Sequence, residues 1–340
     1  MRCKICGSEM KLFINGTFDD RHGYPGLFDI SRCSECGFYS LSPQLTGSEL
    51  DDLYTNYYPR RGLEPDQVLE AVTSLASFKD RVAIWANGTN IFCHFYAKPG
   101  MKVLDYGCGT GTSLIEIKNL GAEAFGIEVD ENIGPIAKAL NLTAHIGSLD
   151  SSPYPDRYFD LVTLNQVIEH VPDPLKLLVA LKAKLKDDGK LMLSCPNVNA
   201  LSRLLTSKKW LHWHVPYHIN HFSRKSIRLL LEQAGLRVLS IKTVTPNLWT
   251  ILQLHSLLAS VNKGERDSSW DPAKTNGEKK VKVLNKQVSL HRKVVKFIAA
   301  SGKAAVMPYN RLIDLLGLGD SFVIEARVDR TKGEMDPTFQ

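Results

Sequence analysis

The chain has 340 residues, of which 44% are hydrophobic and 23% are charged. This composition excludes a disordered chain and predicts a globular protein with one large domain plus attachments, or with two domains. The formal net charge of +6 is moderate for this length, so it points to an anionic partner only if the excess is localised.

The cationic excess is concentrated in one late segment. Residues 278–303 hold one acid, Glu278, and eight Lys or Arg: Lys279, Lys280, Lys282, Lys286, Arg292, Lys293, Lys296 and Lys303. The rest of the chain is nearly neutral, so we expect no nucleic-acid partner. No stretch approaches the roughly 20 apolar residues of a membrane-spanning helix, and the N-terminal sequence MRCKICGSEMK has no apolar run typical of a secretory signal.

The cysteines at the N-terminus predict a metal site. They form two C-x-x-C pairs, Cys3 with Cys6 and Cys33 with Cys36, which together offer a closed tetrahedral set of four thiolates. We therefore predict a structural zinc ribbon over residues 1–45, where zinc compensates for a small core; the alternative is two redox-active pairs. The other three cysteines are isolated, and this pattern indicates a reducing cytoplasm, not a secreted disulfide framework.

Residues 46–98 are predicted to form a helical linker or lid. After Lys102 the pattern changes to alternating strands and helices, beginning with the strand MKVLDYG and the helix SLIEIKNLG. Further strands are predicted in AEAFGIEVD, LTAHIGSLD, FDLVTLNQV, KLMLSCPN and DSFVIEARV, and the long helix in PLKLLVALKAKLKDDG. This alternation predicts an α/β core over residues 99–246 and 319–330, with a parallel sheet covered by helices on both faces.

An insertion is predicted between the last two strands, over residues 247–318. It begins with a short apolar helix in NLWTILQLHSLLASV and continues through a polar loop to a basic amphipathic helix over 281–298. Such a helix favours peripheral contact with an anionic membrane. The alternative is a helical lid or an arm of a homodimer. Residues 331–340 are predicted to be a tail.

A glycine-rich loop follows the first core strand, in VLDYGCGTGTS. Gly107 and Gly109 lie where a doubly wound sheet binds its ligand, beyond the carboxyl ends of the strands. No Gly-Lys-Ser/Thr follows, which excludes a P-loop. Asp105 before the loop disfavours a pyrophosphate, and Glu128 at the end of the second strand is placed to bind ribose hydroxyls. A cationic ligand with a ribose and no phosphate, S-adenosylmethionine, fits these features.

The segments VLDYGCGTG, GIEVD and FDLVTLNQVIEHVPDP resemble successive motifs of class I S-adenosylmethionine-dependent methyltransferases. The resemblance covers residues 100–245 and the terminal strand, and it implies a Rossmann-like, mostly parallel sheet with an antiparallel last strand. It also implies these cofactor contacts: Asp105, Gly107 and Gly109 at the methionine part, Glu128 at the ribose, Val129, Ser148 and Leu149 at the adenine, and Asn165 on the methionine and acceptor side. The family often has an acid where Ser148 stands. A dinucleotide binder is the alternative.

A zinc ribbon before such a domain resembles bacterial methyltransferases of sugar and polysaccharide pathways. Enzymes of this kind often carry a tyrosine-rich link similar to LYTNYYPRRG. The resemblance implies that Tyr54, Tyr57 and Tyr58 lie over the cofactor. The alternative is that they are ordinary packing aromatics.

Four histidines occur in residues 210–223, WLHWHVPYHINHFS. The stretch resembles the P-x-H-x-x-x-F-S segment of this methyltransferase group and is expected at the sheet edge that carries the glycine loop. Because histidine is suited to accept a proton, we predict His218 as the catalytic base, His221 as the second candidate and Tyr217 as a helper. His212 and His214 are expected in an extended stretch that shapes the acceptor pocket, and Glu169 and His170 as pocket architecture. The alternatives are a structural cluster or a metal site, for which the stretch has no neighbouring carboxylate or cysteine.

Together these features predict a cytoplasmic methyltransferase that O-methylates a saccharide, a nucleotide sugar or a glycan precursor. Two alternative enzymes are a sugar C-methyltransferase and an O-methyltransferase of a small molecule or quinol. A third alternative is a binding module, in which the zinc ribbon sits on a methyltransferase fold that no longer catalyses.

Overall fold

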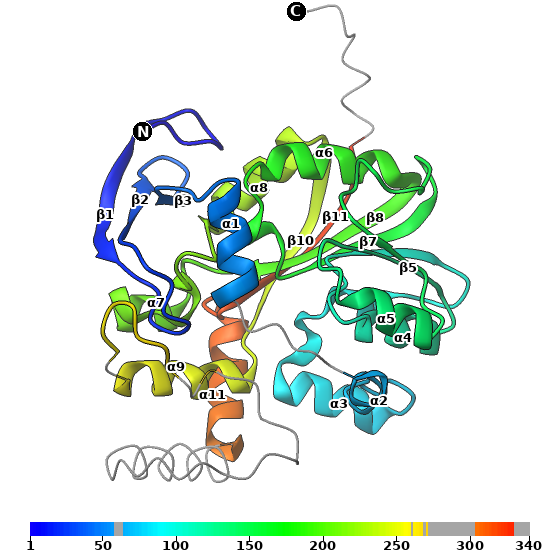
Figure 1. Cartoon of the computed structure of the whole chain (residues 1–340). Coiled ribbons are helices and arrows are strands. Elements are labelled where there is room, and N and C mark those ends of the chain that lie inside the picture. The colour runs from blue at the N-terminus through cyan, green and yellow to red at the C-terminus, as the bar shows by residue number, and fades with distance from the viewer. Residues whose placement is uncertain (58–63, 260, 268–269, 271–302, 330–340) are drawn as a thin grey trace, which may run out of the picture.

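The computed structural model describes residues 1–57, 64–259, 261–267, 270 and 303–329 (Figure 1). Two sheets organise this part of the chain. A large central sheet carries the glycine loop, and a small sheet lies near the N-terminus. The predicted basic helix over 281–298, the predicted tail 331–340 and Tyr58 lie outside the described residues.

The central sheet has seven strands in the order β10-β11-β8-β7-β4-β5-β6. They are β4 (Lys102–Tyr106), β5 (Glu123–Glu128), β6 (Ala144–Ile146), β7 (Phe159–Asn165), β8 (Leu185–Pro196), β10 (Leu236–Val244) and β11 (Ser321–Val328). Strands β6, β5, β4, β7 and β8 pair in parallel, whereas β11 pairs antiparallel with both β8 and β10. The predicted Rossmann-like sheet with an antiparallel last strand is confirmed.

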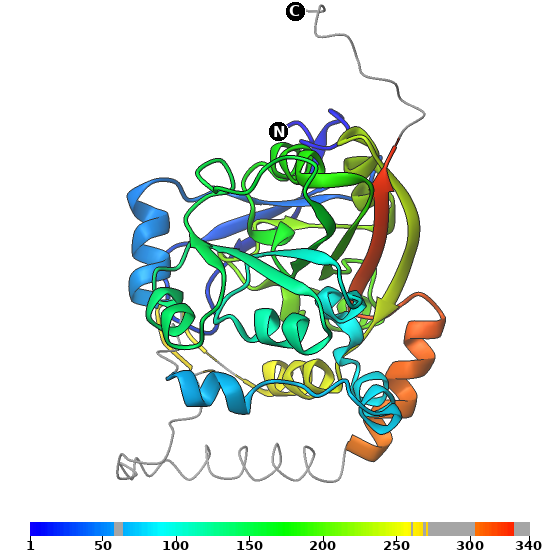
Figure 2. The same ribbon diagram turned by 90° about the vertical axis from the view of Figure 1, so that its right-hand side faces the viewer.

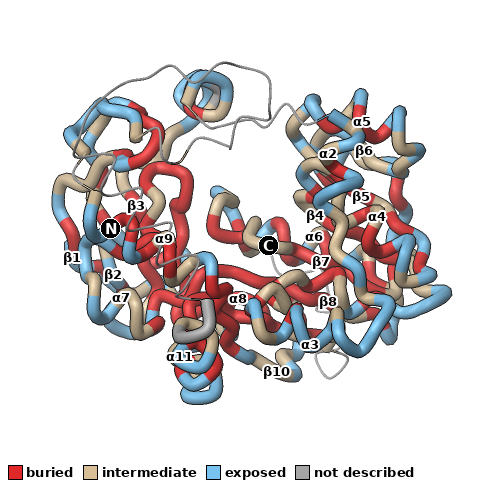
Figure 3. Tube along the Cα trace, turned by 90° about the horizontal axis from the view of Figure 1, so that it is seen from below, coloured by how far each residue is buried: buried red, intermediate tan, exposed pale blue. Residues whose placement is uncertain are grey.

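Helices cover both faces of this sheet, as the alternating pattern predicts. Adjacent strand residues point to opposite faces, so Val103 joins one apolar cluster and Leu104 the other. The Val103 cluster includes α4 (Thr112–Asn119) and α5 (Ile133–Ala139), and the Leu104 cluster includes α6 (Pro174–Lys184) and α8 (Arg224–Gln233). Figure 3 shows buried stretches along the central strands and more exposed residues on the outer helices.

The long helix predicted over residues 174–189 ends earlier than expected. α6 ends at Lys184, and the chain enters β8 at once, because Leu185 pairs with Phe159 of β7 and both side chains are buried. The partner strand therefore overrides the helical pattern of the lysine-rich stretch.

The small sheet contains a strand from a distant part of the sequence. Its order is β1-β2-β3-β9, with β1 (Met10–Thr17), β2 (Phe28–Cys33), β3 (Tyr39–Ser42) and β9 (Asn220–His221), all antiparallel. Tyr39 pairs with His221. The predicted ribbon segment is thus completed by the histidine-rich stretch, which ties the N-terminus to the methyltransferase-like core.

The remaining described helices surround the core. They are α1 (Ser48–Asp52), the π-helical turn Leu53–Tyr57, α2 (Pro65–Glu70), α3 (Phe78–Asn87), α7 (Leu201–Thr206), α9 (Asn247–Leu258) and α11 (Lys303–Leu315). The predicted apolar helix at the start of the insertion is confirmed as α9. α11 contacts both α9 and α3 (Figure 2). Among the described helices, none combines the length and apolar character needed to cross a bilayer.

Candidate functional site

The glycine loop connects β4 to α4 at the carboxyl edge of the sheet. Gly107 has φ 77° and Gly109 has φ 55°, in the left-handed region that favours glycine. A Cβ atom added at Gly107 would lie 2.6 Å from Cγ2 of Val167, whereas one at Gly109 would meet no atom within 4 Å. The loop is therefore packed against the sheet at Gly107 and opens onto free space at Gly109.

Asp105 is an internal hydrogen-bond centre. Its side chain is 1% exposed. One carboxylate oxygen accepts from Ser113 Oγ at 2.5 Å, and the other accepts from Thr163 Oγ1 at 2.6 Å and Asn165 Nδ2 at 3.0 Å. Burial raises the pKa of Asp105, and a favourable interaction with His94 and these hydrogen bonds oppose the rise. Asp105 therefore holds the start of the glycine loop in place through these hydrogen bonds, one of which comes from Asn165.

Glu128 lies across the glycine loop. Its Oε2 accepts from the Gly109 amide at 2.8 Å, and its Oε1 accepts from the Val129 amide at 2.8 Å. Val129 is 71% exposed and Ser148 is also exposed, whereas Leu149 is buried in the core. The Glu128 carboxylate and the exposed residues Val129 and Ser148 therefore lie at one edge of the sheet. Gly109, which has free space beside it, lies at the same edge.

Sequence reasoning missed a buried network behind this edge. Asn165 Oδ1 accepts from the Cys93 amide at 2.6 Å, and Asn165 Nδ2 lies 3.3 Å from Nδ1 of His94. His94 Nε2 lies 2.6 Å from Glu116 Oε2, and Glu116 Oε1 accepts from the Thr73 amide at 2.7 Å. The network joins the helical segment before the core to Asp105. No spacing in the sequence links these positions.

The histidine-rich stretch packs between the core and the small sheet. Leu211–Trp213 forms a 3-10 turn and His214 has a φ of 36°, so the extended conformation expected for His212 and His214 is wrong. His212, His218 and His221 are buried. The aromatic rings drive this compact turn, because Trp210 and Trp213 pack edge to face at 5.1 Å and Trp213 contacts Tyr39 of β3 at 5.8 Å.

Only part of this stretch lies near the end of β7. His218 packs against His170, which follows β7, with ring centroids 4.7 Å apart. His221 instead belongs to β9, and its Nε2 donates to the Trp213 carbonyl at 3.3 Å. Tyr217 is 1% exposed and its ring lies 4.8 Å from that of His214. His218 therefore packs on His170, whereas Tyr217 is buried in the apolar cluster of the small sheet. His221 is part of the small sheet, with its ring 6.3 Å from that of His218.

Glu169 and His170 pack beside His218. They lie in the 3-10 turn Ile168–His170 after β7. Donor atoms of Glu169, His170 and His218 all lie within 4.8 Å of one another. The sequence-based objection to a metal site, the lack of a nearby carboxylate, therefore does not hold, because the fold brings Glu169 to the histidines from 49 positions away.

Burial keeps these groups in their neutral forms. Burial lowers the pKa of His170 to about 4, and burial with the neighbouring His170 lowers the pKa of His218 well below its usual value. Burial also raises the pKa of Glu169 to about 8. Neutral imidazoles carry a free lone pair and can therefore hold a metal ion. The lowered pKa values make both histidines weaker proton acceptors than a free imidazole.

The two described tyrosines of the link lie in different places. The Tyr54 ring lies 6.0 Å from that of Tyr217, at the histidine pocket, whereas Tyr57 packs on Tyr24 of the small sheet at 5.0 Å. Both belong to the apolar cluster around the small sheet. Tyr57 thus corresponds to the alternative of an ordinary packing aromatic.

The four N-terminal cysteines converge on one point. Cys3 Sγ lies 3.6 Å from Cys36 Sγ, and Cys6 Sγ lies 3.4 Å from Cys33 Sγ. All four ligand atoms are within 4.8 Å of one another, and the thiols are free. Tetrahedral zinc with bonds of about 2.3 Å places its sulfur atoms about 3.8 Å apart, so this donor set fits a zinc ion.

Comparison with known proteins shows that part of the chain is similar to known methyltransferase domains. Residues 81–241 match a family model described as a methyltransferase domain. The mitochondrial ubiquinone biosynthesis O-methyltransferase of Schizosaccharomyces pombe is 35% identical over 127 residues, which are 35% of this chain and 46% of the relative. The ubiquinone biosynthesis O-methyltransferase of a Ruegeria species is 30% identical over 165 residues, which are 44% of this chain and 66% of the relative.

The matches cover about half to two thirds of the length of these relatives. Among solved structures, a SAM-dependent methyltransferase from Archaeoglobus fulgidus is 20% identical, with a TM-score of 0.43, covering 73% of this chain and 94% of that chain. A likeness at this level says nothing about the acceptor.

Proposed function

We propose that this chain, which carries a class I S-adenosylmethionine-dependent methyltransferase domain, is an O-methyltransferase of a small organic molecule with a hydroxyl group. The observation that carries the proposal is the match of residues 81–241 to a methyltransferase domain, with a glycine loop that is open at Gly109 beside Glu128.

The acceptor class follows from the names of the relatives. The S. pombe and Ruegeria proteins are ubiquinone biosynthesis O-methyltransferases, which favours a phenolic or quinol-like acceptor over the saccharide, nucleotide sugar or glycan precursor predicted from sequence. Tyr54 is partly exposed and packs on Tyr217 with ring centroids 6.0 Å apart, so it offers an aromatic ring to such an acceptor.

The cofactor site is proposed at the edge formed by β4, β5 and the turn after β6. When bound, S-adenosylmethionine supplies an electrophilic methyl group on a sulfonium. Gly107 and Gly109 would admit its methionine part, and Glu128 would exchange its amide hydrogen bonds for ribose hydroxyls. Val129, Ser148 and Leu149 would bound the adenine. Asp105 and Asn165 would support the loop through their mutual hydrogen bond of 3.0 Å.

His218 is proposed to receive the proton of the acceptor hydroxyl. Its Nδ1 donates to the His212 carbonyl at 2.8 Å, so Nε2 keeps its lone pair. S-adenosylmethionine, when bound, would supply the methyl group to the hydroxyl oxygen, and Nε2 of His218 would take the proton that the hydroxyl loses. His221 is a weaker candidate, because β9 holds it in the small sheet.

Transfer of a radiolabelled methyl group to a panel of acceptors tests the function. Turnover with phenols or quinols but not with nucleotide sugars is the expected result; the reverse preference would restore the saccharide acceptor. His218→Ala should abolish turnover with nearly unchanged cofactor affinity in calorimetry. A wild-type chain that binds no S-adenosylmethionine would instead support the non-catalytic module.

The four cysteines are proposed to hold a structural zinc ion. Removal of one thiolate by Cys33→Ser should release the ion and loosen β1 to β3, because the ion would cross-link the turn before β1 to the turn between β2 and β3. Zinc analysis of the untagged protein, together with thermal melting, checks the proposal. The proposal would be contradicted if the wild-type protein contained no zinc and the Cys33→Ser variant melted at the same temperature as the wild type.

Two proposals about partners rest on the basic insertion. Peripheral contact with anionic membranes and a homodimer arm both depend on residues 278–303, of which the structure describes only Lys303. Co-sedimentation with anionic and neutral liposomes separates them, since only membrane contact requires anionic lipid.

A further inference from the structure

A compact donor cluster lies on the acceptor side of the proposed active site. We call Glu169, His170 and His218 the Glu169 cluster, because their ligand atoms lie within 4.8 Å of one another. Glu169 and His170 follow β7, while His218 comes from the stretch that leads into β9. The cluster exists only when the small sheet is docked on the core.

Among the described residues, none forms a hydrogen bond or ion pair with the carboxylate of Glu169. Its side chain is 0% exposed, and neither oxygen has a hydrogen-bond partner. Within the described part of the chain, no Lys or Arg forms an ion pair with it. A buried carboxylate without a partner is rare in folded proteins, because the lost hydration is not replaced. Such a group calls for a bound cation or a bound proton.

The two histidines of the cluster are arranged as metal ligands usually are. His170 Nδ1 donates to the Tyr217 carbonyl at 3.0 Å, and His218 Nδ1 donates to the His212 carbonyl at 2.8 Å. A hydrogen bond from one ring nitrogen to a carbonyl fixes the tautomer and turns the lone pair of the other nitrogen to the metal. No hydrogen bond engages Nε2 of either ring in the described structure.

We propose that Glu169, His170 and His218 bind a divalent first-row transition metal ion, separate from the zinc site of the cysteines. Two imidazoles and one carboxylate are the donor set that such ions take while leaving coordination positions open. Mg²⁺ and Ca²⁺ prefer all-oxygen sites and fit less well.

The role of the ion rests on the proposed function, although its binding does not. Asn165, four residues before Glu169, bonds to Asp105 under the glycine loop, so the cluster follows the strand that supports the proposed cofactor edge. There the ion would act as a Lewis acid that binds an acceptor oxygen. If the ion occupies Nε2, His218 is a ligand and not the base, so a second bound equivalent of metal would refute its role as proton acceptor and leave the methyltransferase function in place.

The experiment uses the untagged full chain, stripped and then reloaded with Co²⁺, without cofactor or acceptor. We expect two equivalents of cobalt: one with intense thiolate charge-transfer absorption from the cysteines, and one with only weak d–d bands from nitrogen and oxygen ligands. Glu169→Gln, which keeps the shape of the side chain, should lose the second equivalent or bind it at least about tenfold more weakly.

His212→Phe is the matched control. It replaces a buried histidine outside the cluster, keeps a ring against Trp249 and leaves the His212 carbonyl that positions His218. This variant should retain both equivalents. A wild-type chain that binds one equivalent, with a purely thiolate spectrum, overturns the proposal whatever the variants do. Because the readout needs no methyl transfer, a chain with both ions but no turnover would refute the proposed function alone.

Discussion

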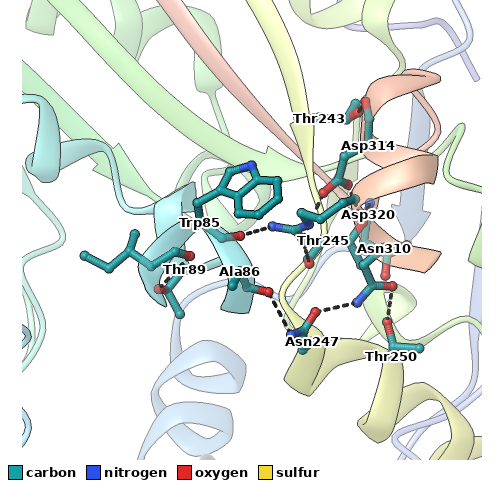
Figure 4. Close-up of polar contacts among 12 residues, drawn as sticks. Trp85, Ala86, Thr89, Thr243, Thr245, Asn247, Thr250, Asn310, Asp314 and Asp320 are labelled. Carbon is teal, nitrogen blue, oxygen red and sulfur yellow. Dashed lines mark hydrogen bonds and ion pairs between the residues drawn. The ribbon is translucent and has the colours of Figure 1, made fainter. Parts of the chain in front are cut away.

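A buried arginine connects the helix before the last strand to the helical segment that precedes the core. Arg311 of α11 is 8% exposed. Its guanidinium donates to the carbonyls of Trp85 and Thr245 and lies 2.9 Å from a carboxylate oxygen of Asp314. Figure 4 shows these partners converging from α3, the end of β10 and α11. We predict that Arg311→Met strongly destabilises the protein.

The magnitude follows from the groups that the substitution leaves behind. Breaking one member of a buried ion pair costs about 3–5 kcal/mol. Asp314 is partly exposed and keeps a hydrogen bond from Thr245 Oγ1 at 2.7 Å, which places the cost near the lower end. We therefore expect a loss of about 3 kcal/mol in the free energy of unfolding. Removing the carboxylate as well, in the double variant with Asp314→Ala, should recover about 1 kcal/mol.

Urea unfolding of the zinc-loaded chain measures these differences, and amide exchange at Gly88, which donates to the Trp85 carbonyl at 3.1 Å, reports whether α3 detaches. Arg228→Met is the control, since its pair with Glu232 at 3.8 Å is exposed and is worth at most about 0.5 kcal/mol. If Arg311→Met costs no more than this control, or the double variant is the least stable of all, the ion-pair reasoning is refuted.

Two further predictions concern the cofactor edge and pH. Gly107→Ala should weaken S-adenosylmethionine binding at least about tenfold more than Gly109→Ala, because both have positive φ but only the first puts Cβ 2.6 Å from Val167; calorimetry that ranks them equally would contradict this. Burial raises the pKa of Asp320 from 3.8 to about 6. The contribution of protonated Asp320 to the free energy of unfolding is therefore complete below pH 4 and is lost as the pH rises through 6. This loss is about 3 kcal/mol. In the Asp320→Asn variant, the free energy of unfolding should change less between pH 4 and 6.

Much of the core was predictable because its signals are local. Short stretches of sequence show the alternating strands and helices, the glycine loop after the first strand and the acid at the end of the second. Parallel strands joined by helices then bring their carboxyl ends to one edge of the sheet. The convergence of Cys3, Cys6, Cys33 and Cys36 was predictable for the same reason, since each pair is bound to a short turn.

The histidine pocket could not be predicted at this level, because it is built by contacts between distant segments. Tyr39 of β3 pairs with His221, the tryptophans fold the preceding stretch into a turn, and this docking carries His218 to Glu169. Local composition favoured an extended stretch, and packing against the small sheet overrode it.

Sequence alone therefore determined the class of fold, the place of the cofactor loop and the cysteine site, since each depends on residues a few positions apart. Only the tertiary structure decided which histidines face the pocket, that a solitary buried carboxylate lies among them, and that Asn165 is joined through His94 to Glu116. These groups meet because segments far apart in the sequence pack against one another, and the energy of that packing comes from buried side chains.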